Sequence, residues 1–288
     1  MTTPAIVGII LGLGLCAYVG FGLILFLIQR KLLYIPRRCR LSEAQTRALG
    51  LDMEFWPTPG ADYQGFIHKP GPSPSRGVVL VFHGNAGSAL DRTYYVSQIE
   101  HLGFRVVLVE YPGYGARTGV CRERDLVAAG IRAASLAFQQ FGQPLILVGE
   151  SLGCGVASAM AAFHDLPIQG VLLITPWDTL PDLAQSLYWF LPARGFIRDR
   201  YDNVGNLRQW AGPLAVVAAE QDEIIPSRNA RRLFDSLACP KRLWVLPGVG
   251  HNNWPAAVGE RWWGDVMGFL SAPSAALSLP RLPTAATA

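Results

Sequence analysis

The hydrophobic pattern of the chain begins with one long uninterrupted run. Residues 5–28 carry no charged side chain. As a helix this run would rise about 36 Å, more than the roughly 30 Å hydrocarbon core of a bilayer. A buried helix rarely stays apolar for so long, and the segment lacks the basic start and the small-residue cleavage site of a signal peptide. The pattern predicts a transmembrane helix over 5–28.

The charges that flank this helix predict its orientation. The N-terminal side carries only the amino group, whereas the first residues after the run are strongly basic. Cytoplasmic flanks are enriched in Lys and Arg, so we expect a single-pass membrane protein whose remaining chain faces the cytoplasm. The basic residues are Arg30, Lys31, Arg37, Arg38 and Arg40.

Small residues recur at every fourth position of the predicted span. Such a stripe lets two membrane helices approach closely, so weak self-association through this face is a further expectation. The stripe consists of Gly8, Gly12, Cys16 and Gly20.

After a basic connector over 29–50, short apolar runs alternate with helical patterns over 51–271. The runs "GVVLVFH", "FRVVLVEY", "PLILVG", "GVLLIT", "PLAVVAA" and "KRLWVLPG" are typical of strands buried on both faces. Two earlier runs, "DMEFW" and "YQGFIHKP", predict an antiparallel edge pair. The pattern predicts an α/β fold with a mostly parallel sheet and helices on both faces.

Two segments depart from this alternation. Residues 176–212 are too many for a plain crossover loop and are rich in aromatic residues and arginine, so we expect a small helical cap. Residues 272–288 are biased towards Pro, Ala and Ser, which is typical of a disordered tail.

Composition excludes several classes of partner. The 25 basic and 21 acidic residues nearly balance, and positive charge gathers beside the predicted span, so a nucleic-acid partner is not expected. The five cysteines are scattered, with no CxxC pair and no histidine at metal spacing. We therefore expect no disulfide framework and no metal site.

The chemistry of the chain centres on the pentapeptide Gly149-Glu-Ser151-Leu-Gly153. A predicted strand leads into it and a predicted helix leaves it, which is the setting of a nucleophile elbow. The flanking glycines permit a tight turn that exposes the serine hydroxyl above the sheet.

A serine hydroxyl needs a base, and the base needs a carboxylate to orient it. Asp222 and His251 each follow a predicted strand, in the chain order Ser, Asp, His. Glu220 and Glu223 are rival acids; Glu220 could belong to the strand end, and we expect Glu223 to be solvated.

The glycine-rich "VFHGNAGS" lies between a strand and a helix, where donors for an oxyanion belong. We assign the oxyanion hole to the backbone amides of Asn85 and Leu152, and expect His83 to shape the turn by hydrogen bonding. No phosphate-binding signature is present there.

The motifs "FHGNAGS", "EYPGYG", "VGESLGCGVA", "EQDEIIP" and "GVGHNN" occur in the order found in the alpha/beta-hydrolase superfamily, which the chain resembles over about 50–271. It is most similar to a membrane-anchored, serine-aminopeptidase-like subgroup of alpha/beta-hydrolase domain proteins. The resemblance implies a nucleophile at Ser151, an acid at Asp222 and a base at His251.

The leading hypothesis is a serine hydrolase that needs no metal or cofactor and cleaves an ester or thioester through an acyl-enzyme. Aromatic residues of the predicted cap, Trp177, Tyr188 and Trp189, suggest an apolar, lipid-derived acyl substrate. Tyr114, in the glycine-rich turn "YPGYG", is a further pocket candidate. An amidase or peptidase with the same triad stays open, as does a catalytically silent, membrane-anchored scaffold.

Overall fold

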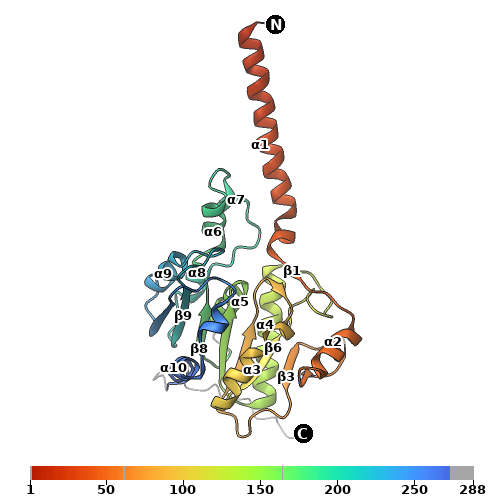
Figure 1. Ribbon diagram of the computed structural model, residues 1–288, viewed down its shortest axis with the longest axis vertical. Helices are drawn as coiled ribbons and strands as arrows, with labels where there is room; N and C mark the ends of the chain where they lie inside the picture. Colours follow the sequence, from red (N-terminus) through yellow and green to blue (C-terminus); the bar gives the residue numbers. More distant parts are fainter. Residues whose placement is uncertain (1, 61, 164, 273–288) are drawn as a thin grey trace.

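The computed structural model describes residues 2–60, 62–163 and 165–272 (Figure 1). Helix α1 (Thr3–Leu33) stands out from the rest of the protein as one straight rod, and it is long and apolar enough to cross a membrane. Its small-residue stripe is open, because a Cβ added at Gly8, Gly12 or Gly20 would meet nothing within 4 Å. Self-association there stays a prediction. The tail prediction for 272–288 falls almost wholly outside the described residues.

The rest of the described chain is built on an eight-stranded sheet with the order β10-β9-β8-β7-β4-β6-β3-β2. The strands from β4 to β10 run parallel, whereas β3 is antiparallel to both β6 and β2. The predicted edge pair and parallel sheet are therefore both confirmed. The strands are β2 (Met53–Trp56), β3 (Gly65–His68), β4 (Val78–Phe82), β6 (Arg105–Val109), β7 (Leu145–Glu150), β8 (Ile168–Ile174), β9 (Leu214–Ala219) and β10 (Lys241–Leu246).

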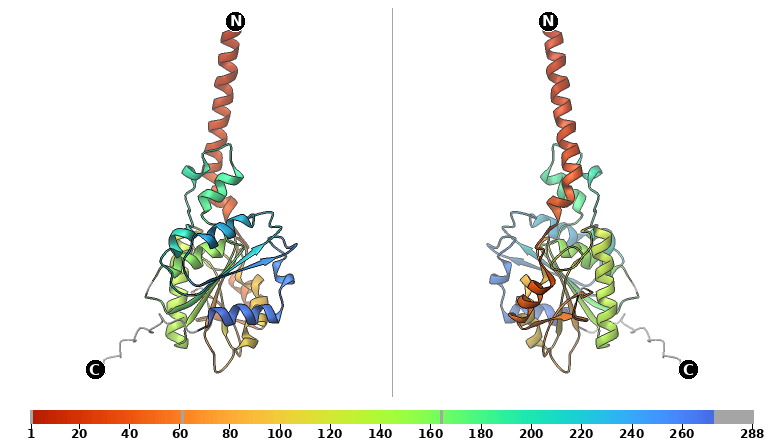
Figure 2. Two further views of the ribbon diagram at one scale, coloured as in Figure 1. Left: turned by 90° about the vertical axis from the view of Figure 1, so that its left-hand side faces the viewer. Right: turned by 90° about the vertical axis from the view of Figure 1, so that its right-hand side faces the viewer.

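Helices cover both faces of this sheet (Figures 1 and 2). Alternate side chains of one strand enter different cores: Leu80 and Phe82 pack with α4 (Glu123–Phe141), α5 (Leu152–Ala161), α8 (Asn203–Leu207) and α9 (Arg228–Asp235). The intervening Val79 and Val81 pack with α3 (Tyr94–Ile99) and α10 (Glu260–Leu270). Burial on both faces explains why these strands read as continuous apolar runs.

The segment predicted as a connector over 29–50 contains regular structure. Helix α1 continues to Leu33, β1 (Ile35–Pro36) pairs in parallel with β5 (Ala86–Gly87), and α2 (Leu41–Leu49) follows. The helix continues past the charge boundary because its last turns pack against the cap. The chain that follows the apolar run is thus held to the loop at 83–88 by the β1–β5 pairing.

The cap contains α6 (Leu180–Leu187) and α7 (Ala193–Phe196) and lies beside the lower part of α1 (Figures 1 and 2). Thr179 caps α6 by accepting a hydrogen bond from the Asp182 amide at 3.1 Å. Arg30 donates to both carboxylate oxygens of Asp199, at 2.8 and 3.1 Å. This paired contact ties α1 to the segment that follows α7.

Candidate active site

Ser151 lies on the sharp turn between β7 and α5. Its backbone has φ 52° and ψ −113°, a strained conformation for a residue with a side chain. The turn is held by a 2.9 Å hydrogen bond from the Ser151 amide to the carbonyl of Ile174 on β8. A Cβ at Gly149 would lie 2.6 Å from the Cα of Cys154, and one at Gly153 would overlap the Phe82 carbonyl. Only glycine fits on either side of this serine.

Three side chains from separate loops meet at the carboxyl edge of the sheet. Ser151 Oγ lies 3.0 Å from His251 Nε2, and His251 Nδ1 lies 2.7 Å from Asp222 Oδ2. Because a carboxylate only accepts, Nδ1 is the donor and Nε2 is free to accept the serine proton. All three residues are 8% exposed. The structure thus brings together the three residues singled out from the sequence.

The loop after β9, which carries Asp222, is held by its own backbone amides. Asp222 Oδ1 accepts hydrogen bonds from the amides of Ile224 and Ile225, at 2.9 and 2.6 Å. These bonds fix the carboxylate, so that its other oxygen faces the imidazole.

The two rival acids support the histidine loop and do not contact the imidazole. Glu223 accepts a hydrogen bond from the backbone amide of His251 at 3.1 Å, and Glu220 accepts one from Gly248 at 2.9 Å. Backbone hydrogen bonds, from its own amide and that of His251, hold the pKa of Glu223 below its usual range. Glu223 is exposed, as the sequence predicts, and its side chain also holds the backbone of His251.

The loop after β4 is tied to the C-terminal end of α1. The Asn85 side chain donates to the Leu33 carbonyl at 2.9 Å, and the Asn85 carbonyl accepts from the Ile35 amide at 2.9 Å. The Asn85 amide itself has no acceptor among the described residues. Leu152 begins α5, so its amide is one of the N-terminal donors without a partner inside the helix.

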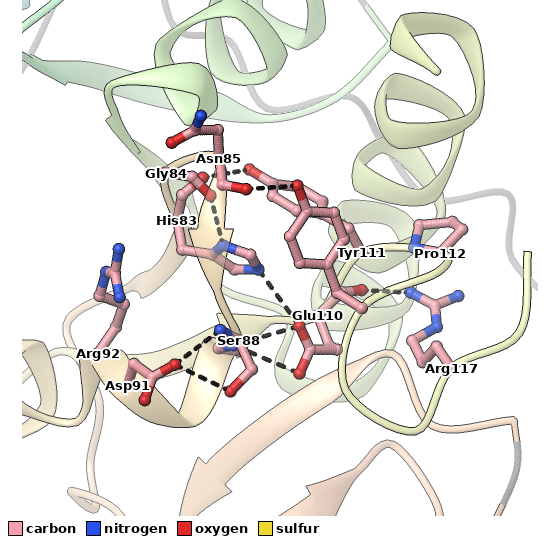
Figure 3. Close-up of polar contacts among 12 residues, drawn as sticks. His83, Gly84, Asn85, Ser88, Asp91, Arg92, Glu110, Tyr111, Pro112 and Arg117 are labelled. Carbon is pink, nitrogen blue, oxygen red and sulfur yellow. Dashed lines mark hydrogen bonds and ion pairs between the residues drawn. The ribbon is translucent and has the colours of Figure 1, made fainter. Parts of the chain in front are cut away.

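His83 shapes this loop from behind (Figure 3). Its Nδ1 donates to the Gly84 carbonyl at 2.8 Å, and its Nε2 lies 3.2 Å from the buried Glu110 carboxylate. Beside it, Asp91 accepts from the Ser88 amide at 2.7 Å and completes a capping box at the start of the short helix over Ala89–Arg92. Both ring nitrogens of His83 are thus engaged, one by the loop itself and one by Glu110, which leaves the serine to His251.

Glu150, next to the serine, forms a polar cluster that the sequence did not reveal. It pairs with Arg92 at 2.9 Å and accepts hydrogen bonds from Tyr94 and Tyr95 at 2.7 and 3.2 Å. Burial raises the pKa of Glu150, but the Arg92 charge and the Tyr94 hydroxyl outweigh it and hold the pKa below its usual range. An ionised, fully paired carboxylate thus supports the elbow.

A cavity of about 520 Å³ opens over Ser151 and His251. Its walls come from α1, the cap and the loop after β4, and they are largely apolar. Of the predicted pocket aromatics, Trp177 and Tyr188 line this cavity. Tyr114 does not, because it is buried behind the loop and donates to the Asn85 carbonyl. Trp189 does not either, because it points outward and is 78% exposed.

Comparison with known proteins agrees with this architecture. Residues 77–208 match the family model described as alpha/beta hydrolase fold. The uncharacterized protein Rv2307c of Mycobacterium tuberculosis is 33% identical over 244 residues, which cover 82% of this chain and 86% of that protein. The chain belongs to the alpha/beta hydrolase family. Among the described residues of this family member, no group of three or more His, Cys, Asp or Glu side chains could hold a metal ion.

Two further relatives extend the comparison. The lysophosphatidylserine lipase ABHD12 of Danio rerio is 28% identical over 188 residues, which cover 59% of this chain and 49% of that protein. The chain thus spans about half of that lipase. The esterase PF2001 of Pyrococcus furiosus superposes with a TM-score of 0.61 at 15% identity, covering 83% of this chain and 97% of the esterase. At that identity the likeness concerns the fold alone.

The close contacts around Gly153 predict that even a methyl side chain at this position destabilises the protein. Gly153→Ala forces a methyl group into the Phe82 carbonyl, which belongs to the central strand and cannot rotate away, so we expect a loss of about 3 kcal/mol or more. Thermal unfolding of the purified protein measures this loss. Gly264→Ala in α10 is the control: its added Cβ meets nothing within 4 Å, and helix propensity should stabilise it slightly. Equal melting temperatures for the two variants would contradict the packing described.

Proposed function

We propose that this protein is a membrane-anchored serine hydrolase that cleaves a carboxylic ester or thioester with an apolar acyl chain. The observation that carries the proposal is the continuous hydrogen-bonded series from Ser151 through His251 to Asp222 at the floor of the cavity. Burial of all three groups makes that series stronger than it would be in water.

The first half of the reaction forms an acyl-enzyme. His251 Nε2 removes the hydroxyl proton of Ser151 as Oγ attacks the substrate carbonyl carbon, and Asp222 stabilises the resulting imidazolium. The carbonyl oxygen becomes negative and accepts hydrogen bonds from the amides of Asn85 and Leu152, each worth about 3 to 4 kcal/mol of transition-state stabilisation. The carbon–oxygen or carbon–sulfur bond of the substrate then breaks, and His251 returns its proton to the leaving group.

The second half releases the acid. His251 removes a proton from a water molecule as the water oxygen attacks the acyl carbon, and the same two amides receive the oxyanion. The bond to Ser151 Oγ breaks, and the serine recovers its proton from the imidazolium. The net reaction adds one water across the ester, so no cofactor is required.

The walls of the cavity favour a hydrocarbon chain in the acyl group. Leu25 and Phe26 of α1 line it together with the cap residues Leu183 and Leu191. Burying a methylene group contributes roughly 0.8 kcal/mol, so even a short aliphatic chain gains substantial affinity. The lipase name of the relative in Danio rerio agrees with a lipid ester.

We further propose a cytoplasmic location for the hydrolase domain. The charges that follow the apolar stretch of α1 include Arg30, Lys31 and Arg37, whereas the opposite end carries none in its first turn. This asymmetry favours the cytoplasmic side for the folded domain.

Covalent labelling with a fluorophosphonate tests the nucleophile. We expect the full-length protein in detergent to be labelled at Ser151, Ser151→Ala to lose labelling, and His251→Ala to slow it by about 100-fold or more, because the general base is missing. The exposed pair Ser97→Ala and His101→Ala serves as a control that keeps the wild-type rate. A well-folded protein that stays unlabelled would favour the silent scaffold.

Hydrolysis of a homologous ester series tests the substrate class. We expect kcat/KM for p-nitrophenyl esters to rise with acyl length by up to about fourfold per methylene until the cavity is filled. Anilides of the same acids, measured beside them, test the amidase alternative. A rate that is highest for the acetate, or higher for the anilides, would refute an apolar-chain esterase.

A further inference from the structure

The tip of the cap exposes an unusual cluster of large apolar side chains. Trp189 is 78% exposed, and four neighbours within ten residues are exposed with it. Single exposed apolar residues are common on soluble proteins, but a contiguous group marks a contact with another apolar phase. We call this group the cap tip; it consists of Leu187, Tyr188, Trp189, Phe190 and Phe196.

The cap tip lies against the middle of the apolar helix. Tyr18 donates a 2.8 Å hydrogen bond to the Phe190 carbonyl, and the rings of Phe21 and Phe190 stack with centroids 6.2 Å apart. Further along, Phe26 meets Phe196 edge to face, also at 6.2 Å. Figure 2 shows the cap beside the lower half of α1 in both views.

The length of the helix decides what surrounds these contacts. A span needs about 20 residues, and the uncharged stretch is 5–28. Every window of that length inside the stretch contains both Tyr18 and Phe21. Wherever the bilayer sits along α1, the residues that touch Phe190 therefore lie at hydrocarbon depth, and Phe190 lies there with them.

Beyond Phe196, the change from apolar to charged residues occurs at the same level on the cap as on α1; Arg194, within the cap, is paired with Asp182. Charges on α1 begin at Arg30, one residue after Gln29. Gln29 donates to the Phe196 carbonyl at 3.2 Å and accepts from the Arg198 amide at 2.8 Å, and the Arg198 guanidinium lies 4.1 Å from the Phe26 ring centroid. A matched boundary of this kind is what a single membrane surface crossing both elements requires.

We propose that the cap tip inserts into the bilayer beside α1, and that the active-site cavity takes its substrate sideways from the membrane. The partner of this surface is a lipid bilayer. The cavity extends from Gly22 and Tyr188, at the level of the cap tip, to Ser151 and His251 at its floor. An acyl chain can therefore pass from lipid to the serine along apolar walls. The insertion stands on geometry alone, whereas the substrate route rests on the proposed hydrolase function.

Tryptophan fluorescence tests the insertion. The span holds none of the eight tryptophans, so Trp189 is the residue that reports on the cap tip. In phosphatidylcholine bilayers with brominated acyl chains, we expect the full-length protein to lose part of its emission, and Trp189→Phe, which keeps an aromatic ring, to lose most of that quenching. Equal quenching of the two proteins, or none in the wild type, would overturn the insertion.

Comparing a membrane-held ester with a water-soluble ester tests whether the substrate enters the cavity from the membrane. Trp189→Glu places a charge at hydrocarbon depth, so we expect hydrolysis of p-nitrophenyl palmitate held in vesicles to fall by about tenfold or more. Hydrolysis of p-nitrophenyl acetate in water and labelling of Ser151 should stay within about twofold of wild type, which also shows that the variant is folded. Val120→Glu, at another exposed apolar residue outside the cap, is the matched control.

The outcomes separate the two proposals. If Trp189→Glu lowers the hydrolysis rates of both esters equally, or lowers neither rate, the membrane route is overturned. If wild-type protein hydrolyses neither ester and Ser151 is not labelled, the hydrolase function fails, and the fluorescence result still decides the insertion.

Discussion

The structure depends on the contact between the C-terminal end of α1 and the loop that carries Asn85. The Asn85 side chain binds the Leu33 carbonyl, its own carbonyl binds the Ile35 amide, and the next residues form the short β1–β5 ladder. These bonds do not use the Asn85 amide, which has no acceptor among the described residues. The helix that would cross the bilayer is thus part of the proposed catalytic apparatus and is more than a tether.

The same helix joins the site to the cap. Arg30 binds Asp199 at the base of the cap, and Tyr18 and Phe21 contact its tip. Helix α1 runs unbroken through all three contacts. Together, α1 and the cap therefore form a continuous wall along the cavity. A hydrolase built in this way would hold the serine at a set distance below the membrane surface.

Much of this arrangement could be predicted from the sequence. Parallel strands buried on both faces have a distinctive apolar pattern, and their carboxyl ends share one edge, so the meeting of Ser151, Asp222 and His251 followed from the order of elements. The choice between Asp222 and its neighbour Glu223 rested on position and motif, because both are carboxylates in one loop. The structure separates them: one faces the imidazole, and the other binds the histidine backbone.

The remaining features depend on contacts between distant segments, which composition and periodicity do not encode. Tyr18 and Phe190 are 172 residues apart, and nothing local in either segment indicates that they meet. Tyr114 and Trp189 were predicted as pocket residues from their aromatic character, yet one is buried behind a loop and the other faces outward. Their direction is set by packing, so it could be learned only from the fold.

The most direct test is a crystal structure of the full-length protein in a lipidic phase after Ser151 has reacted with a long-chain alkyl phosphonate, a stable mimic of the tetrahedral intermediate. We expect the phosphonyl oxygen to accept hydrogen bonds from the amides of Asn85 and Leu152, and the alkyl chain to run between α1 and the cap towards Gly22. A phosphonyl oxygen turned away from these amides, or a chain that leaves towards the aqueous face, would contradict the account.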